Sequence, residues 1–346
     1  MSTASPLLAP LSILYGGVIG VRNWYYNHVA GAVRYAAVPV ISVGNLTVGG
    51  TGKTPFVIET VRRLSAMNCR PAVLTRGYKA VRGQPADEVR EFAEVLPNVP
   101  VIANPNRVAG AATACREKKA DCLVLDDGFQ HRRLHRDLDI LLIDALNPWG
   151  AGHLLPAGRL REPVSSLRRA DLFVITRVNQ AEHGAVAAIA AVLRHHTGDK
   201  PIVLAALEAD TLVGADGQPR PPTELTAHKI LAVCGIGNPR TFEKLVEALI
   251  GKAVTNLRFR DHHNYGPADV DNIVSAARDC WVVTTRKDWV KLRPLWPDRG
   301  PPLMRLDIKL TLTAGFAEFD SRLRGVTTSI RDRGAPREPA QPPRKR

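Results

Sequence analysis

The sequence predicts an α/β fold: a mostly parallel β-sheet flanked by helices, with a second, smaller α/β domain. Three observations support this. Short apolar runs alternate with helix-length segments along most of the 346 residues, as in chains of βαβ units. Most of these runs are continuous rather than alternating, which is typical of strands buried on both faces of a parallel sheet. One run ends in a Gly-rich turn that opens a helix, "VPVISVGNLTVGGTGKTPF".

The first expected element is a helix within residues 1–37. Pro6 to Val21 is uncharged and mostly apolar and lacks the basic start of a signal peptide. Its 16 residues fall short of the roughly 20 that span a bilayer. Aromatic and basic residues follow, as in helices that lie in the membrane interface: Arg22, Trp24, Tyr25, Tyr26, His28 and Arg34. The alternative is a helix packed on the domain or on a partner subunit.

The remaining elements fall into a large domain, residues 38–215, and a smaller one, residues 216–330. Strands are expected at Val38–Val43, Ala72–Thr75, Val101–Ala103, Cys122–Leu125, Ile140–Ile143, Leu172–Ile175, Ile202–Ala205, Ile230–Val233, Trp281–Thr284 and Leu303–Leu306. Helices are expected at Thr54–Met67, Arg107–Lys118, Ala185–His195, Pro239–Leu249 and Pro267–Arg278. The polar, Pro-rich stretch that begins at Asp216 predicts the boundary. The basic, Pro-rich residues 331–346 predict a disordered tail.

The composition indicates an anionic partner. The net charge is +14 and the isoelectric point about 9.9, which favours a nucleic acid, an anionic membrane surface or a phosphorylated substrate. Aromatic residues are only 5% of the chain and no RNA-stacking motif is present, so nucleic acid is the weaker option. The alternative is a solubilising excess of surface arginine. The five cysteines form no CxxC pair, which indicates reduced thiols rather than disulfides or a zinc site.

The Gly-rich turn has the context of a phosphate-binding P-loop, a strand followed by Gly-Lys-Thr at the start of a helix. Gly49, Gly50, Thr51 and Gly52 would present backbone N–H groups to phosphate oxygens. Lys53 is then expected to reach the β- and γ-phosphates, and the Thr54 hydroxyl to bind Mg²⁺. Thr47 replaces the usual first glycine, and Val48 stands where partitioning-type ATPases carry an extra lysine. The alternative is a Gly-rich surface turn beside a lysine.

A second strand ends in two carboxylates, in "CLVLDDGFQHRRL". Asp126 and Asp127 match the end of a Walker B strand, where a carboxylate binds Mg²⁺ directly or through water. The alternative is a pair of loop aspartates that cap the next element. Together with the P-loop, this strand predicts a P-loop NTPase-like domain.

Several motifs occur in an order that resembles one known family. They are "VGNLTVGGTGKTP", "TRGY", "NPNRVAGA", "LDDGFQHRRL", "LLPAGRLREP", "GIGNPRTF", "FRDHHNYG" and "TRKDWVKL". This pattern, from Val38 to Leu292, is similar to that of the tetraacyldisaccharide 4'-kinases of lipid A biosynthesis. The resemblance implies ATP- and Mg²⁺-dependent phosphorylation of the 4'-hydroxyl of a tetraacylated glucosamine disaccharide 1-phosphate. It also implies a two-domain P-loop fold with a peripheral N-terminal helix at the cytoplasmic face of the inner membrane.

The resemblance also implies a proton acceptor and a metal ligand between the P-loop and the Walker B strand. The family has a Gly-Asp-Glu-Pro motif there, and the nearest match is "PADEVREF". Ala86 and Val89 replace its glycine and proline, and the segment is shorter than in the family. Asp87 is therefore expected as the general base and Glu88 as a Mg²⁺ ligand. The alternative is an acidic first turn of a helix, which the helix dipole favours by itself.

A histidine of the smaller domain is expected to complete this site. His262 in "RDHHNYG" resembles the family's Asp-His motif, and it would hydrogen-bond the base when the domains close. Asp261 would orient it, and His263 is the adjacent alternative. The alternative is that His262 and His263 are ordinary loop histidines without a catalytic role.

Further residues carry over from the motifs. Arg107 and Arg161 suit the substrate's 1-phosphate or the transferred group, since guanidinium groups bind phosphate bidentately. Gln130 is expected to reach the metal shell, Asn45 to shape the loop or touch substrate, and Tyr78 to stack near the sugar. Ordinary structural hydrogen bonds are the alternative for each. Lys287 and Asp288 suggest a nucleotide contact in the second domain or, equally, a loop with a salt bridge.

Two other functions stay open at this stage. One is a P-loop ATPase that acts as a switch or chaperone, and the other is a kinase with a soluble substrate. The missing signature lysine at Val48 and the Asp87–His262 pair argue against the first. The sequence predicts neither the acyl-chain preference nor the oligomeric state.

Overall fold

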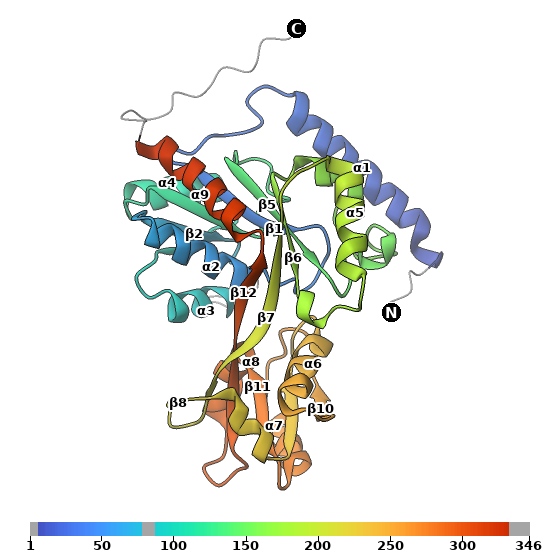
Figure 1. The fold of residues 1–346 in the computed structure, drawn as a ribbon, viewed down its shortest axis with the longest axis vertical. Coiled ribbons are helices and arrows are strands. Elements are labelled where there is room, and N and C mark those ends of the chain that lie inside the picture. Colours follow the sequence, from blue (N-terminus) through green and yellow to red (C-terminus); the bar gives the residue numbers. More distant parts are fainter. Residues whose placement is uncertain (1–5, 78–86, 332–346) are drawn as a thin grey trace. The chain divides into compact units, whose positions relative to one another are not determined.

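The chain forms two compact units in the computed structural model, which describes residues 6–77 and 87–331 (Figure 1). The first unit contains the described residues up to Ala206 and those from Leu312 onward. The second contains Leu207–Thr311. Residues 332–346 of the predicted tail lie outside the described part.

The first unit is built on a parallel sheet. Its strands, in spatial order, are β7 (Ile202–Val213), β6 (Leu172–Thr176), β5 (Leu138–Asp144), β1 (Val40–Asn45), β4 (Cys122–Asp126), β2 (Pro71–Thr75) and β3 (Val101–Ala103). Neighbouring strands in this order pair in parallel. Every residue of β1, β4, β5 and β6 is buried, because helices cover both faces. The continuous apolar runs therefore predicted this sheet correctly.

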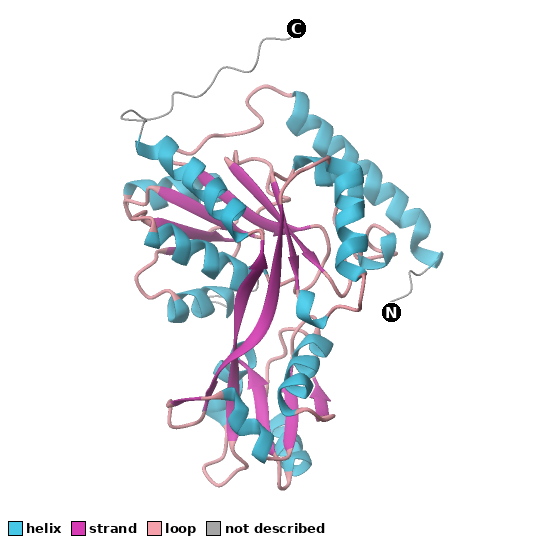
Figure 2. Ribbon diagram, in the orientation of Figure 1, coloured by secondary structure: helices cyan, strands magenta, loops and turns pink. Residues whose placement is uncertain are grey.

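Helices cover the two faces of this sheet (Figure 2). They are α2 (Lys53–Ala66), α3 (Asp87–Val95), α4 (Arg107–Arg116), α5 (Ala185–Thr197) and α9 (Phe316–Arg331). The helices α4 and α5 pack on one face, where Leu123 of β4 and Leu141 of β5 contribute to the two apolar clusters that they cover. On the other face, Phe56 of α2 packs against Phe319 of α9, with ring centroids 5.2 Å apart.

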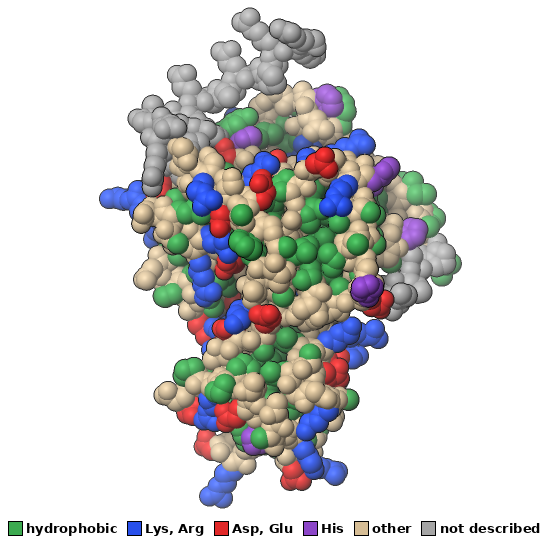
Figure 3. All heavy atoms as spheres, viewed as in Figure 1, with side chains coloured by type: hydrophobic (Ala, Val, Ile, Leu, Met, Phe, Trp, Pro, Cys, Tyr) green, Lys and Arg blue, Asp and Glu red, His purple; other side chains and the backbone are tan. Residues whose placement is uncertain are grey.

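The inward side of the N-terminal helix α1 (Ala9–His28) combines the polar residues Ser12 and Tyr15 with the buried Ile19, while several apolar side chains face outward. Ser12 donates to the carbonyl of Leu154, and Tyr15 donates to that of Arg161 at 2.9 Å. The outward side chains of Ile13 and Val21 are 75% and 70% exposed. Figure 3 shows hydrophobic side chains along this helix, at the right-hand side of the view. Within the described residues, no helix is long and apolar enough to cross a membrane.

The second unit is a smaller α/β layer with its own core. Its strands, in spatial order, are β10 (Thr255–Arg258), β9 (Ile230–Cys234), β11 (Trp281–Thr285) and β12 (Leu303–Ala314), and these pair in parallel. The short strand β8 (Pro219–Arg220) pairs with β7. Alternate residues of β9 point into two different clusters, one covered by α6 (Pro239–Ile250) and the other by α7 (Pro267–Ala277) and α8 (Arg286–Leu292).

The division between the units differs from the expected boundary at residues 215 and 216. Strand β7 continues past Ala206 into the second unit, and β12 carries the chain back at Leu312. The sequence does not reveal this boundary, because the chain passes from one unit to the other within the strands β7 and β12 and not through a polar loop. The predicted boundary stretch at Asp216 is instead a turn between β7 and β8 within the second unit.

Candidate active site

The candidate site lies where β1 and β4 end side by side. Val43 pairs with Asp126 in the parallel register, so the loops that follow both strands leave the same edge of the sheet. The loop after β1 has left-handed glycines, with φ of 117° at Gly49 and 84° at Gly52. Such backbone angles are readily available to glycine, and they turn the chain sharply into α2. This is the strand–turn–helix context that the sequence predicted.

Lys53 stands at the start of α2 and binds the ends of both strands. Its ammonium group donates to Oδ1 of Asn45 at 3.1 Å and lies 3.4 Å from Oδ1 of Asp127. Asn45 also donates to the carbonyl of Thr47 at 2.7 Å, which fixes the first turn of the loop. Asn45 therefore contacts both Lys53 and the first turn of the loop, and its role in the site stays a prediction. Thr54 follows on α2 and is half-buried.

Asp127 has two cationic neighbours. Arg161 donates to its Oδ2 at 2.7 Å, while Lys53 faces Oδ1. Burial by itself raises the pKa of Asp127, but the charges of Lys53 and Arg161 outweigh it and lower the pKa from 3.8 to about 2. The residue has a left-handed backbone, with φ 54°. Asp127 is therefore ionised throughout the physiological pH range.

The second aspartate and the glutamine of this motif lie beside the loop. Asp126, the last residue of β4, is 4% exposed. Gln130 donates through Nε2 to the carbonyl of Asn45 at 2.9 Å, and its Oε1 accepts from Arg161 at 3.4 Å. The side chain of Gln130 thus connects β1 to Arg161. Among the described residues, no group of three His, Cys, Asp or Glu side chains is placed to hold a metal ion.

Arg107 and Arg161, both predicted to bind phosphate, differ in their surroundings. Arg107 opens α4, is 3% exposed, and donates to the carbonyl of Asn104 at 3.1 Å. Arg161 lies within the cluster around Asp127. The structure therefore brings Arg161 to the P-loop, whereas Arg107 donates to the loop before its own helix.

Three predicted residues have side chains that the structure does not describe. Tyr78 lies outside the described residues. Asp87 and Glu88 are the first two residues of α3, but their side chains are outside the described part. Their backbone position agrees with the acidic first turn of a helix, which was the stated alternative to a catalytic role.

His262 belongs to the second unit, in the loop after β10. It has a left-handed backbone, with φ 62°, and its Nε2 lies 3.2 Å from Nζ of Lys287. Lys287 also lies 3.3 Å from Oδ1 of Asp261, so its ion pair is with Asp261 and not with Asp288. Asp288 is fully buried and accepts from the amide of Gly235 at 2.9 Å. It thus supports the loop after β9.

Three charged residues around the P-loop were not predicted from the sequence. Arg159 donates to the carbonyl of Val48 at 3.2 Å. Arg177 donates to the carbonyl of Gly50 at 2.6 Å and to Oδ2 of Asp144 at 2.5 Å. The available signal was positional: Asp144 and Arg177 stand at the ends of two apolar strands, at the edge where sites of parallel sheets form.

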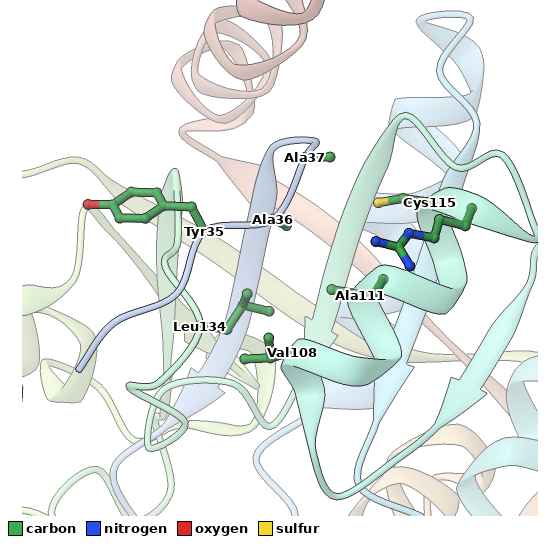
Figure 4. A pocket seen from close by; sticks show the side chains of 9 residues that line it. Tyr35, Ala36, Ala37, Val108, Ala111, Cys115 and Leu134 are labelled. Carbon is green, nitrogen blue, oxygen red and sulfur yellow. The ribbon is translucent and has the colours of Figure 1, made fainter. Parts of the chain in front are cut away.

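A small apolar recess lies along α4, lined by nine residues: Tyr35, Ala36, Ala37, Val108, Ala111, Ala112, Cys115, Arg116 and Leu134 (Figure 4). Its volume is about 220 Å³. Burial raises the pKa of the Cys115 thiol, so this cysteine is not an activated nucleophile.

The fold and the loop together define the class of protein. A parallel sheet, a Gly-rich loop between β1 and α2, a lysine at the start of that helix and an acidic end to β4 are the features of P-loop NTPase-like proteins.

Comparison with known proteins gives the family. Residues 4–326 match the model of the tetraacyldisaccharide-1-P 4'-kinase (LpxK) family, and the chain belongs to that family. It is 40% identical to the tetraacyldisaccharide 4'-kinase of Anaeromyxobacter sp. (strain Fw109-5) over 83% of each chain. It is 37% identical to that of Halothermothrix orenii over 82% of each chain.

A solved structure agrees over nearly the whole chain. It is an LpxK from Aquifex aeolicus in complex with ATP, with 31% identity and a TM-score of 0.70. The match covers 92% of this chain and 98% of that chain. The resemblance seen in the motifs, and the α/β fold with a mostly parallel sheet, are thereby confirmed.

Proposed function

We propose that this chain transfers the γ-phosphoryl group of ATP to the 4'-hydroxyl of a tetraacyl glucosamine disaccharide 1-phosphate. Family membership assigns it tetraacyldisaccharide 4'-kinase activity in lipid A biosynthesis. The observation that carries the proposal is the P-loop, whose lysine lies within contact distance of the Walker B-type Asp127.

The P-loop is suited to an anionic triphosphate. Among the described residues, the amides of Gly49, Thr51 and Gly52 donate no hydrogen bond within the protein. Lys53 adds a positive charge beside them, and the N-terminus of α2 adds its partial charge. ATP is the nucleotide in the related Aquifex aeolicus structure, and we expect the same nucleotide here.

The residues near the loop also fit Mg²⁺. This ion is usually bound by one or two carboxylates together with substrate phosphates and water, so it needs no larger cluster of protein ligands. Thr54 and Asp126 are the expected ligands, with Glu88, Asp127 and Gln130 as further candidates. When bound, Mg²⁺ neutralises charge on the β- and γ-phosphate oxygens.

Transfer to an alcohol needs a group that accepts its proton. We assign this role to Asp87, and to His262 the role of hydrogen-bonding and orienting that carboxylate. The support is the resemblance of both motifs and, for Asp87, its place at the first turn of α3.

The proposed acceptor is a phosphorylated sugar with acyl chains. Arg107 and Arg161 are proposed to hold its phosphate, with Asn45 beside them and Tyr78 near the sugar. Arg161 already balances Asp127 at 2.7 Å, so its guanidinium lies at the loop where the sugar hydroxyl has to arrive. Acyl chains keep such a substrate at a membrane surface.

The outward apolar stripe of α1 supports peripheral association with that membrane. A helix with exposed Ile13, Val18 and Val21 can bury these side chains at the boundary between head groups and acyl chains. The net charge of +14 favours an anionic surface. We propose the cytoplasmic face of the inner membrane as its location.

The deciding experiment incubates the chain with γ-³²P-labelled ATP and the disaccharide lipid acceptor in mixed micelles. We expect the label in the glycolipid, at the 4'-position. Release of free phosphate that does not depend on the acceptor would instead indicate a switch-type ATPase. Label transfer to a soluble sugar with no preference for the acylated one would indicate a kinase of soluble substrates.

A further inference from the structure

We propose that Arg177, held by Asp144 and assisted by Thr176, is a positioning residue that presets the P-loop for the triphosphate. It pulls loop carbonyls toward the protein, so that the following amides face the nucleotide. This inference rests on the proposed function, because it assumes that the loop binds a nucleoside triphosphate.

The guanidinium of Arg177 makes two different contacts. One nitrogen donates to the carbonyl of Gly50 at 2.6 Å, and the other donates to Oδ2 of Asp144 at 2.5 Å. The second oxygen of Asp144 accepts from the amide of Leu146 at 3.1 Å. The carboxylate is therefore fixed by the backbone of its own strand end, and it fixes the guanidinium in turn.

Thr176, the neighbour of Arg177, makes the equivalent contact one peptide further along. Its hydroxyl donates to the carbonyl of Thr51 at 2.9 Å, and its backbone carbonyl accepts from Ala145 at 3.0 Å. Asp144 and Thr176 are paired in the sheet. Two rigid strand ends, β5 and β6, thus hold two consecutive carbonyls of the P-loop.

The consequence follows from the geometry of the peptide bond. In a trans peptide the C=O and the following N–H point in opposite directions. Because Arg177 holds the Gly50 carbonyl, the N–H of Thr51 points away from β6. Because Thr176 holds the Thr51 carbonyl, the N–H of Gly52 also points away from β6. These are two of the amides that donate no hydrogen bond among the described residues. The loop is thereby preset before the nucleotide arrives, which lowers the ordering cost of binding.

Backbone strain at Arg177 supports a role beyond packing. Its φ of 61° and ψ of 33° are left-handed, a conformation that is unfavourable for residues other than glycine and is often retained at functional sites. The side chain is also 5% exposed. An ion pair that only stabilised the fold would need neither the strained backbone nor the contact with Gly50.

A second buried ion pair, at the opposite end of β5 from Asp144, provides a matched control. Arg136 and Asp139 form a buried ion pair at 2.7 Å, with side chains 11% and 5% exposed. Among the described residues, Arg136 makes no hydrogen bond with the P-loop; it donates to Asp139 and to the carbonyl of Leu134. Arg136→Lys therefore perturbs a buried pair of β5 without touching the phosphate loop.

The experiment compares Arg177→Lys with Arg136→Lys in the full chain. Lysine keeps the positive charge but lacks the planar guanidinium group that donates to Gly50 and Asp144 at the same time. We expect Arg177→Lys to raise the dissociation constant of ATP, measured calorimetrically with Mg²⁺, by about tenfold or more. The KM for ATP rises with it and the KM for the lipid acceptor stays unchanged. Arg136→Lys leaves both the dissociation constant and the KM for ATP unchanged, even if the midpoint of thermal unfolding falls.

A second variant keeps the test decisive if Arg177→Lys does not fold. Thr176→Val removes the hydroxyl that holds Thr51 and should raise the ATP dissociation constant in the same direction, by a smaller factor. Unchanged ATP affinity in a folded Arg177→Lys, or in Thr176→Val where that protein alone folds, overturns the proposal. An equal loss of affinity in Arg136→Lys overturns it too. Because ATP binding is measured without the acceptor, the result decides the role of Arg177 whether or not the lipid is phosphorylated.

Discussion

Three charged side chains share a small volume at the P-loop. Lys53 and Arg161 both approach the carboxylate of Asp127, so the trio carries one excess positive charge. A triphosphate adds negative charge beside it and would draw Lys53 from Asp127 toward the β- and γ-phosphates. Arg161 is then left to balance Asp127, which explains why one carboxylate faces two cations.

The first prediction concerns Lys53. Replacing it by methionine removes the charge at the phosphates and leaves Asp127 paired with Arg161. We expect kcat to fall by roughly 10²–10³-fold, the effect of removing one preorganised charge from a transition state. Steady-state kinetics measure this, with Lys309→Met as the control, because Lys309 is a half-exposed residue of β12. Near-normal turnover of Lys53→Met would refute the proposed role of the loop.

The second prediction concerns His262. Replacing it by alanine should lower kcat by roughly 10²–10⁴-fold, the usual contribution of acid–base assistance, while KM for ATP changes little. His263→Ala is the comparison, since the Nε2 of His263 lies 3.0 Å from Asp269 and its loss should reduce stability rather than turnover. A larger loss of kcat in His263→Ala would transfer the role to that neighbour.

The third prediction is a pH dependence of stability. Burial and neighbouring positive charge lower the pKa of His131 from 6.5 to about 4. The charged neighbours are Arg107, Arg136, Arg133 and Arg22. The unfolded chain therefore binds a proton at His131 below about pH 6.5 that the folded chain does not bind until about pH 4. Folding stability contributed by this residue is present above pH 6.5 and is lost as the pH falls toward 4.

Thermal unfolding between these two pH values tests this prediction. His131→Gln should show a smaller decrease of the unfolding midpoint on acidification than the unaltered chain. His195→Gln, which alters an exposed histidine of α5, should keep the full decrease. Equal slopes for the His131 variant and the unaltered chain would contradict the assigned pKa.

At the level of elements, α1 inverts the usual arrangement of an amphipathic helix. Its residues Tyr15, Arg22 and Asn23 contact the protein through polar groups, with Asn23 donating to the buried Glu162 at 3.1 Å. The helix is thus held by hydrogen bonds and by the buried Ile19, while most of its large apolar side chains face outward. The sequence showed that the apolar run is too short to span a bilayer. It could not show which side of the helix faces the protein, because that depends on loops more than a hundred residues away.

The fourth prediction tests the outward face of α1. The double variant Ile13→Asp/Val21→Asp alters side chains that are 75% and 70% exposed, so the folded protein should lose little stability. We expect much weaker co-sedimentation with phospholipid vesicles, because the charges oppose burial in the membrane interface. Ile308→Asp, at a position 41% exposed in β12, should bind vesicles normally. Undiminished binding of the double variant would exclude α1 as the membrane contact.

Other elements show where sequence reasoning succeeds and fails. The ten predicted strands all exist, and most of them are continuous apolar runs. Strand β10, "TNLR", was not predicted, since it has one apolar side chain and lies at the edge of its sheet. Helix α9 was also missed, although its buried Phe319, Leu323 and Val326 have helical spacing. Its partner Phe56 lies far away in the sequence.

Some residues of the candidate site were predicted from the sequence and others were not. Motif residues such as Lys53 and Asp127 were predicted because their chemistry requires a fixed spacing along the chain. Arg177 and Asp144 act through a pairing of β5 with β6, which only the folded sheet reveals. A sequence pattern contains the groups that touch a ligand, whereas the groups that hold them come from distant strands.

At the level of the whole molecule, the charge of +14 acts over a longer range than any single contact. The fifth prediction is that binding to vesicles with anionic lipid weakens as salt rises from about 0.1 M to about 1 M, because the Debye length falls from roughly 10 Å to 3 Å. Binding to vesicles of uncharged lipid should be weaker and insensitive to salt. Salt-independent binding to the anionic vesicles would show that net charge plays no part.

The second unit occupies one uninterrupted stretch, Leu207 to Thr311, between two portions of the first. It is therefore tethered at both of its ends, through β7 and β12. A protease that nicks only one tether leaves it attached by the other, and its release takes two cuts. The portion after β12 includes α9, whose Phe319 is fully buried in the first unit. Cutting out the second unit would therefore separate α9 from the rest of the first unit's chain. The first unit then keeps this covering helix only through non-covalent packing.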